Sequence, residues 1–341
     1  MAWPALLVAA GARPVGEARA MTDDLLRKTE IEAPSGGRGR VGPRIGLALG
    51  AGAARGWAHI GALHELTAMG LVPDVVVGSS IGALVGGCFA AGRLDELEAF
   101  ARSLTRRRVF GMLDFSFSGA GLIGGDRLRV RLQESIGAMR VEDLPMRFAG
   151  VATELGTGHE VWLRRGSLVD AMRASYALPG VLEPVRLGRR WLIDGAVVNP
   201  VPVSVARALG AERVIALSIA IDGSGRGATR HDGVETDGLE DEEAPPPERR
   251  VANLLRRRRP GASAPGVASV MVDAFNITQD RLMRSRLAGD PPDVLINLKA
   301  GRIGVFEFDR AEELIAVGRE AVRRARAEIA ECFDLAPAVE G

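Results

Sequence analysis

The sequence predicts an α/β fold with a mainly parallel central sheet. Short apolar runs alternate along the chain with segments of helical spacing, and glycines directly follow several of the runs. Short, fully apolar runs are typical of strands buried on both faces of a parallel sheet. The chain has 341 residues, of which 47% are hydrophobic and 26% charged, so it can bury a substantial core.

Two strand–turn–helix units open the predicted fold. Residues 44–49 form an apolar run followed by glycines, and residues 56–69 have the apolar spacing of a helix that ends at Gly70. Residues 74–77 then predict a second strand, and after a Gly/Ser turn residues 81–91 predict an apolar helix. A repeated strand–helix alternation favours parallel pairing of the two strands.

Further strands and helices continue this alternation. Ser167 and Asp170 form a capping pair that predicts a helix running to Ala177, where Pro179 and Gly180 stop it. Two helices are predicted near the end of the chain, over 267–287 and 309–332. The additional strands are predicted over 147–153, 159–163, 190–194, 214–219 and 294–297.

One folded domain is expected, at 44–331, interrupted by an insertion. Residues 221–266 contain Gly, Pro, an acidic cluster and an arginine run but few large apolar residues. Such a composition cannot offset the entropy cost of ordering, so we expect a disordered insertion at 222–265. The segments 1–43 and 332–341 are expected to be a disordered N-terminal tail and a C-terminal tail.

Charge and cysteine content exclude several classes of protein. The 44 basic and 43 acidic residues give a net charge of +1, so we expect no nucleic-acid partner. The two cysteines, Cys88 and Cys332, form no disulfide framework, and the four histidines lack metal-ligand spacing. We therefore expect no metal, no cofactor and a cytoplasmic location, with peripheral contact at the inner membrane face as a further possibility.

The most informative motif is Gly78-Ser79-Ser80-Ile81-Gly82, which lies between a predicted strand and a predicted helix. This G-x-S-x-G pattern in a strand–turn–helix context is typical of a nucleophile elbow, in which a sharp turn exposes the serine Oγ. Ser80 is then the candidate nucleophile, with Gly78 and Gly82 as the elbow glycines. The alternative is a helix N-terminus at which the serine only caps backbone N–H groups.

A nucleophilic serine needs a base, and two residues are candidates. His231 is the only histidine after Asp194, but it lies in the segment expected to be disordered and so cannot be held in position. Asp194 ends a predicted strand, which would place it at the carboxyl edge of the sheet. An ordinary aspartate is a weak base for a hydroxyl, so Asp194 would need desolvation and a hydrogen bond to Ser80. The alternative is that Asp194 and Gly195 only form a turn.

The Gly-rich turn at residues 50–56 follows the first predicted strand. Small residues before a helix let backbone N–H groups approach an anion, and the helix adds its positive end. The anion could be the oxyanion of an acyl-transfer intermediate or the pyrophosphate of a dinucleotide. The dinucleotide reading is the weaker one, because the ribose-binding acid expected at the end of the next strand is absent; Asp74 begins that strand instead.

Taken together, these motifs resemble those of the patatin-like phospholipase family. The resemblance rests on the Gly-rich loop with Arg55, on the motif around Ser80, and on Asp194-Gly195-Ala196 with Asn199-Pro200 after it. The segment 174–180 resembles the connecting segments of that family. The likeness covers about 44–220 and resumes over about 267–330, which is nearly all of the expected folded part.

The resemblance implies a three-layer patatin-like sandwich and an acyl hydrolase with a Ser80–Asp194 dyad. It implies an oxyanion hole made by the Gly-rich loop, namely Gly50, Ala51, Gly52, Ala53 and Arg55. Two of the loop positions at which the family usually has glycine are alanines here, Ala51 and Ala53. Alanine disfavours positive φ, so the loop would function only if both alanines have ordinary backbone angles.

The implied substrates are fatty acyl esters of phospholipids or lysophospholipids. Residues 106–125 contain three arginines followed by Phe110, Phe115 and Phe117, which would suit docking on an anionic bilayer. The same phenylalanines could instead fill the core. Two other functions stay open: a catalytically silent lipid-binding or regulatory protein of the same fold, and a dinucleotide-binding protein that uses Gly50–Gly56.

Overall fold

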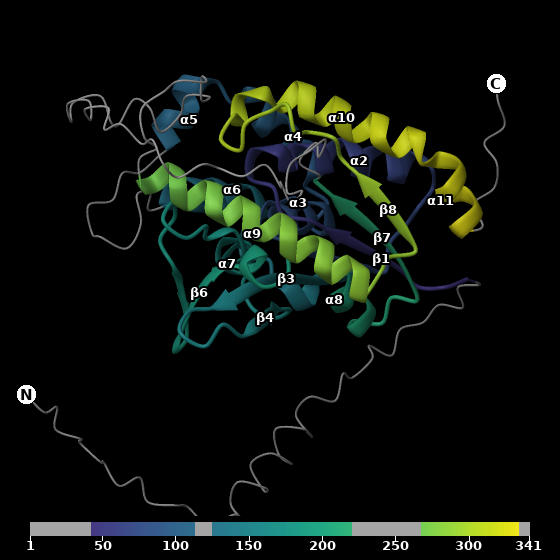
Figure 1. Ribbon diagram of the computed structural model, residues 1–341, viewed down its shortest axis with the longest axis horizontal. Coiled ribbons are helices and arrows are strands. Elements are labelled where there is room, and N and C mark those ends of the chain that lie inside the picture. The colour runs from purple at the N-terminus through teal and green to yellow at the C-terminus, as the bar shows by residue number, and fades with distance from the viewer. Residues whose placement is uncertain (1–41, 113–124, 220–266, 334–341) are drawn as a thin grey trace, which may run out of the picture. The chain divides into compact units, whose positions relative to one another are not determined.

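The computed structural model describes residues 42–112, 125–219 and 267–333, and these residues form an α/β fold around one mixed sheet (Figure 1). The strand order is β5-β6-β3-β2-β1-β7-β8, and β4 pairs with β3 away from this path. The strands are β1 Ile45–Leu49, β2 Val75–Ser79, β3 Arg147–Glu154, β4 Glu160–Leu163, β5 Val185–Leu187, β6 Arg190–Asp194, β7 Arg213–Ser218 and β8 Val294–Asn297.

The sheet is mostly parallel, as the sequence predicts. The pairs β1–β2, β1–β7, β2–β3 and β7–β8 are parallel, whereas β3–β4, β3–β6 and β5–β6 are antiparallel. All five residues of β1 and of β2 are buried, which fits the fully apolar runs of their sequences. The antiparallel strands lie at one end of the sheet, and they bring Asp194 back toward its centre.

Helices cover both faces of the sheet and make the fold three-layered. One face packs its apolar side chains, including Leu47 and Leu49, against a large cluster that involves α2, α3, α4, α7, α10 and α11. The other face packs against α8 and the C-terminal half of α9. The bounds are α2 Ala58–Ala68, α3 Ile81–Ala90, α4 Leu94–Ser103, α5 Arg106–Met112, α6 Asp126–Ile136, α7 Leu168–Tyr176, α8 Val203–Ala208, α9 Val267–Gly289, α10 Ala311–Arg324 and α11 Arg326–Phe333.

Most predicted elements are found close to their expected positions, but the structure also has helices α4, α5, α6 and α8, for which the sequence predicted no range. The predicted helix over 309–332 is two helices, α10 and α11, which are separated by Ala325. The short strand β5 was not predicted, because three residues are too few to show a period of two. The capping pair is present: Ser167 Oγ accepts a hydrogen bond of 3.2 Å from the N–H of Asp170 at the start of α7.

The described residues also include the short 3-10 helices η1 Ala53–Trp57, η2 Val141–Asp143, η3 Gly195–Val197 and η5 Phe308–Arg310. The expected tail at 1–43, apart from its last two residues, and the whole insertion at 222–265 lie outside the described residues. So does the expected C-terminal tail beyond Phe333, whose side chain is buried as part of α11.

Candidate active site

Ser80 occupies a strained turn between β2 and α3. Its backbone angles are φ 57° and ψ −127°, and within the described residues only Ala53 shares a positive φ without being glycine. A positive φ is unfavourable for a residue with a Cβ and persists only where the surroundings impose it. The turn has the strand–turn–helix context of a nucleophile elbow.

Gly78 and Gly82 explain how this turn can form. A Cβ on Gly78 would lie 2.3 Å from the amide nitrogen of Ala83 in α3, and one on Gly82 would lie 2.2 Å from the carbonyl oxygen of Leu49. Both contacts are shorter than any real Cβ contact, and both are with backbone. The two glycines therefore let α3 pack against the ends of β2 and β1.

The pairing of β3 brings Asp194 to the side of Ser80. On β3, Val151 pairs with Ser79, the last residue of β2, and the next residue, Ala152, pairs with Asp194, the last residue of β6. The antiparallel strand β6 thus ends where β2 ends. As a result, Ser80 Oγ donates a hydrogen bond of 2.6 Å to Asp194 Oδ2, between residues 114 positions apart.

Asp194 is fully buried, and both its carboxylate and its backbone oxygen accept hydrogen bonds. Its Oδ1 accepts a bond of 2.8 Å from the N–H of Ala196, and its backbone oxygen accepts one of 2.9 Å from Thr153 Oγ1. Burial raises the pKa of Asp194 from 3.8 to about 7, while the hydrogen bonds from Ser80 and Ala196 partly oppose the rise. A carboxylate with a pKa near 7 is a much better base for a hydroxyl than an ordinary aspartate.

A second serine fixes the backbone of the turn. Ser175 Oγ accepts a hydrogen bond of 3.0 Å from the N–H of Ser80 and donates one of 2.5 Å to the carbonyl of Val151. The N–H of Ser80 is therefore occupied and cannot stabilise an oxyanion. Ser175 lies in the segment 174–180 that carries part of the family resemblance, so that segment held the signal for it.

The Gly-rich loop offers fewer N–H donors than its sequence implies. The N–H groups of Gly50 and Ala51 donate bonds of 2.9 Å to the carbonyls of Leu217 and Pro200. Those of Gly52 and Ala53 have no acceptor among the described residues. These two groups are the loop's remaining donors for an oxyanion, and both residues line a cavity with Ser80.

Ala53 departs from the ordinary backbone angles that we expected both alanines to need, and the loop forms nonetheless. Ala53 has φ 50°, in the left-handed region, whereas Ala51 is not among the residues with positive φ. For a residue with a Cβ this conformation costs about 1–2 kcal/mol. The loop holds Ala53 in it because the next residue, Ala54, donates its N–H to the carbonyl of Val305 at 3.0 Å.

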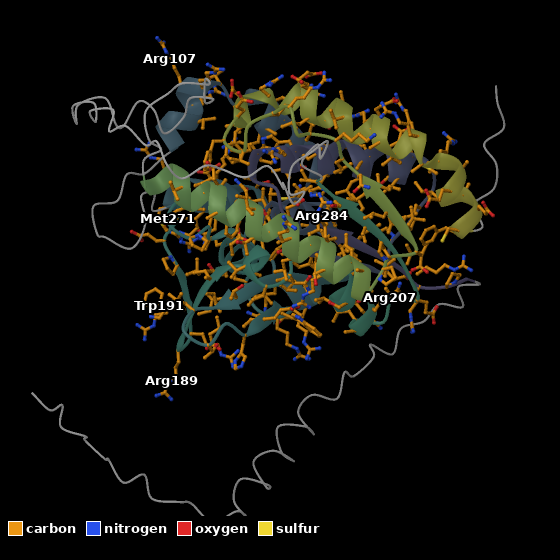
Figure 2. All side chains as sticks on the ribbon, in the orientation of Figure 1. Arg107, Arg189, Trp191, Arg207, Met271 and Arg284 are labelled. Carbon is orange, nitrogen blue, oxygen red and sulfur yellow. The ribbon has the colours of Figure 1, made fainter. Side chains whose placement is uncertain are left out.

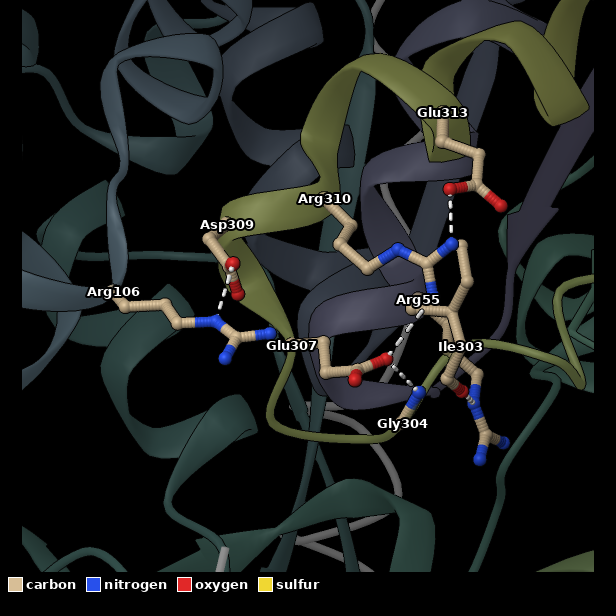
Figure 3. Close-up of polar contacts among 8 residues, drawn as sticks. All are labelled: Arg55, Arg106, Ile303, Gly304, Glu307, Asp309, Arg310 and Glu313. Atoms are coloured by element: carbon tan, nitrogen blue, oxygen red, sulfur yellow. Dashed lines mark hydrogen bonds and ion pairs between the residues drawn. The ribbon is translucent and has the colours of Figure 1, made fainter. Parts of the chain in front are cut away.

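Arg55 ties the loop to the segment after β8. Its Nε donates a hydrogen bond of 2.8 Å to the carbonyl of Ile303, as Figure 3 shows. The same segment is braced by the Glu307 carboxylate, which accepts a bond of 2.7 Å from the N–H of Gly304. Arg55 thus supports the loop through its bond to the segment after β8.

His59 supports the same loop and was missed by the sequence reasoning. It is fully buried, and its Nε2 lies 2.7 Å from the carbonyl oxygen of Gly50. Because a carbonyl only accepts, Nε2 carries the proton in this contact. Burial lowers the pKa of His59 to about 4, against the opposing effect of this hydrogen bond, so the ring is neutral near pH 7. Histidine spacing alone gave no signal for this role.

The space next to Ser80 is small, and it is covered by α9, a helix far from Ser80 in the sequence. A cavity of about 20 Å³ is lined by Ser80, by Gly52 and Ala53 of the loop, and by side chains of α9. This volume holds about one water molecule.

Within the described residues, no group of three metal-binding side chains is found, and no helix there is long and apolar enough to span a bilayer.

Comparison with known proteins identifies the family. The model of the patatin-like phospholipase family matches residues 47–207. An uncharacterized NTE family protein of Mycobacterium tuberculosis is 34% identical over 337 residues, covering 84% of this chain and 92% of that protein. A patatin-like phospholipase domain-containing protein of Caenorhabditis elegans is 35% identical over 189 residues, covering 52% of this chain and 14% of the other.

The solved structure of VipD from Legionella pneumophila matches 55% of this chain and 51% of its own chain, with a TM-score of 0.36 and 12% sequence identity. A similarity this low supports no inference about function. The sequence relatives are decisive, because one of them is aligned over nearly its whole length. The chain belongs to the patatin-like phospholipase family, and the NTE family protein that it matches aligns with it over most of the length of both chains.

Proposed function

We propose that the protein is a serine acyl hydrolase that cleaves fatty acyl esters of phospholipids or lysophospholipids through Ser80 and Asp194. The observation that supports this most is the hydrogen bond of 2.6 Å from Ser80 Oγ to a buried carboxylate, at a strained strand–turn–helix junction. A nucleophile in contact with its base is the first requirement for covalent catalysis. Family membership adds the lipid ester as the class of substrate.

In the proposed reaction, Asp194 takes the proton of Ser80 as Oγ attacks the ester carbonyl carbon. The N–H groups of Gly52 and Ala53 stabilise the resulting oxyanion, and the N-terminus of α3 adds a positive potential. Asp194 then gives its proton to the leaving alcohol, which leaves an acyl-enzyme. A water molecule loses a proton to Asp194, attacks the acyl-enzyme and releases the fatty acid, and the proton returns to Ser80.

The dinucleotide-binding alternative finds no support in the loop. Two of its N–H groups, those of Gly50 and Ala51, already donate to backbone carbonyls, so they cannot cradle a pyrophosphate. The catalytically silent alternative has one observation in its favour, which is the small cavity over Ser80. A direct test of covalent reactivity distinguishes it from the hydrolase.

The test is labelling by a fluorophosphonate together with turnover of a short p-nitrophenyl ester. Wild type should be labelled at Ser80, Ser80→Ala should be neither labelled nor active, and Asp194→Asn should lose about 10²–10⁴-fold in rate. The matched control is Ser79→Ala, which removes the neighbouring hydroxyl, a buried group with no partner among the described residues. Activity that survives in Ser80→Ala but is lost in Ser79→Ala would contradict the proposal.

The substrate class is tested by fatty acid release. Wild type should release fatty acid from micelles of lysophosphatidylcholine or of phosphatidylglycerol with detergent, and Ser80→Ala should release none. Hydrolysis of p-nitrophenyl esters without release from either lipid would retain the esterase chemistry but reject the phospholipid substrate.

A further inference from the structure

Helix α9 covers the candidate nucleophile. Side chains of Val272, Phe275, Asn276 and Gln279 line the cavity of about 20 Å³ that also contains Ser80. A space for about one water molecule cannot admit the carbonyl group and acyl chain of a lipid ester. If the protein acts on such esters, the N-terminal half of α9 must move away from Ser80 before substrate binds.

The half of α9 over Ser80 is weakly held. None of the side chains described between Val270 and Gly289 is buried, including the inward-facing Phe275. The attachments lie in the C-terminal half: Met283 and Leu287 pack against the core, and Arg286 pairs with Glu160 at 3.4 Å. Among the described residues, no hydrogen bond or ion pair joins the turns from 270 to 279 to the rest of the protein. Among the described residues, the C-terminal half is therefore the better anchored part of the helix.

The outer face of the same turns is apolar. Ile277 is 63% exposed, the largest fraction among the large apolar side chains that the structure describes, and Val270 and Met271 are 48% and 52% exposed. Figure 2 shows Met271 near one end of α9 and Arg284 farther along it. Single exposed apolar residues are common on protein surfaces, but Val270 and Ile277 lie seven residues apart and so share one side of the helix.

The pattern along the outer face is that of a helix that lies in a lipid interface. Val270, Ala274, Ile277, Arg281 and Arg284 follow one another at spacings of four and three residues, so they share one stripe of the helix. All five are exposed. The stripe is apolar over its first turns and carries two arginines over the next, of which Arg284 pairs with Asp280 at 3.0 Å. Apolar positions followed by polar ones suit insertion of the apolar turns below the lipid headgroups.

We propose that the outer face of α9 docks on an anionic phospholipid surface, and that docking draws the helix away from Ser80. The apolar side chains then pass from water into the interface, which offsets the loss of the weak inner contacts. The movement of α9 away from Ser80 matters only if the proposed function holds, whereas binding of the helix to lipid does not depend on that function. Asp273 is the exposed acidic residue of the same turns, and it would lie at headgroup level.

Docking is tested without catalysis, in the Ser80→Ala background. Vesicles of equal parts phosphatidylglycerol and phosphatidylcholine should bind the protein, and adding Ile277→Asp should weaken binding at least about tenfold, because one large apolar contact is lost. The matched control is Val72→Asp, which places the same charge at another exposed valine, 59% exposed and outside α9. Unchanged binding in Ile277→Asp, or an equal loss in Val72→Asp, overturns the proposal. So does a dimer that Ile277→Asp dissociates while vesicle binding stays intact, since the face would then bind a second copy.

Gating is tested by the rate at which fluorophosphonate labels Ser80. The same vesicles should accelerate labelling of the wild-type chain at least about tenfold and should not accelerate labelling of Ile277→Asp. Equal rates with and without vesicles, in a protein that binds them, overturn the movement of α9 away from Ser80. If no serine is labelled under any condition, the proposed hydrolase function fails, whereas the binding measurement still decides whether the helix binds lipid.

Discussion

Replacing Asp194 by asparagine should stabilise the folded protein while removing its proposed activity. The carboxylate is fully buried, and burial raises its pKa from 3.8 to about 7. An amide at this position can still accept the N–H of Ala196 and can donate to Ser80 Oγ, so the hydrogen bonds have replacements. What the substitution removes is the cost of burying a negative charge.

The sign and size of the effect follow from linkage. The folded protein keeps a proton on Asp194 up to about pH 7, whereas the unfolded chain loses it near pH 3.8. The stability of the wild type therefore falls as the pH rises through this window. The difference of about three units between the folded and unfolded pKa of Asp194 corresponds to at most about 4 kcal/mol of unfolding free energy. The wild type loses most of this stability by pH 8 but less than half of it by pH 5.

The assay is urea unfolding of wild type and Asp194→Asn at pH 5 and pH 8. The variant should gain more stability at pH 8 than at pH 5, by about 2 kcal/mol. Asp273→Asn, at an exposed position on α9, is the control and should change the stability little at either pH. An equal gain at both pH values, or none at pH 8, would refute the assignment of a buried, high-pKa carboxylate.

Three further predictions concern the same site. The kcat/KM of the wild type on a soluble ester should rise with pH through about 7, as Asp194 loses its proton, and a flat profile from pH 5 to 8 would exclude it as the base. His59→Phe should lower kcat at least about tenfold, because it leaves the Gly50 carbonyl without its hydrogen-bond donor. His59→Gln keeps a donor and should retain most of the wild-type rate. Equal losses in the two variants would reject the positioning role of His59. Ala53→Gly should leave the free energy of unfolding unchanged or raise it by up to about 1 kcal/mol, because it relieves a φ of 50°, while its neighbour Ala54→Gly should lower it by about 1 kcal/mol in the same urea experiment.

The fold was predictable where local signals are strong. Apolar runs followed by glycine predicted β1 and β2, and the capping pair of Ser167 and Asp170 predicted the start of α7. Where the local signal is weak the prediction was incomplete. Apolar spacing continues from Leu314 to Ile329 as if through one helix, so the sequence did not reveal the break at Ala325.

The candidate site was predictable in its reactive groups but not in their supports. Ser80 and Asp194 were selected because a nucleophile and a base require those residue types at strand ends, and the structure places their side chains in contact. The donors of the loop could not be assigned in the same way. Whether the N–H of Gly50 is available depends on the carbonyl of Leu217, a partner 167 positions away that shows no pattern in the sequence.

Helix α9 shows the limit of periodicity most clearly. Its spacing predicted a helix over 267–287, and a helical period states which residues share a face but not what lies against that face. Here the inner face, with Phe275 and Gln279, meets the candidate nucleophile Ser80, which precedes Phe275 by 195 residues, and the outer face leaves Val270 and Ile277 exposed. A helix selected only for stability would bury its most apolar side chains, yet Ile277 points outward while Gln279 faces the cavity. That arrangement costs hydrophobic stabilisation in water, and it is understandable if the helix also has a second, lipid-bound position in which Ile277 is covered.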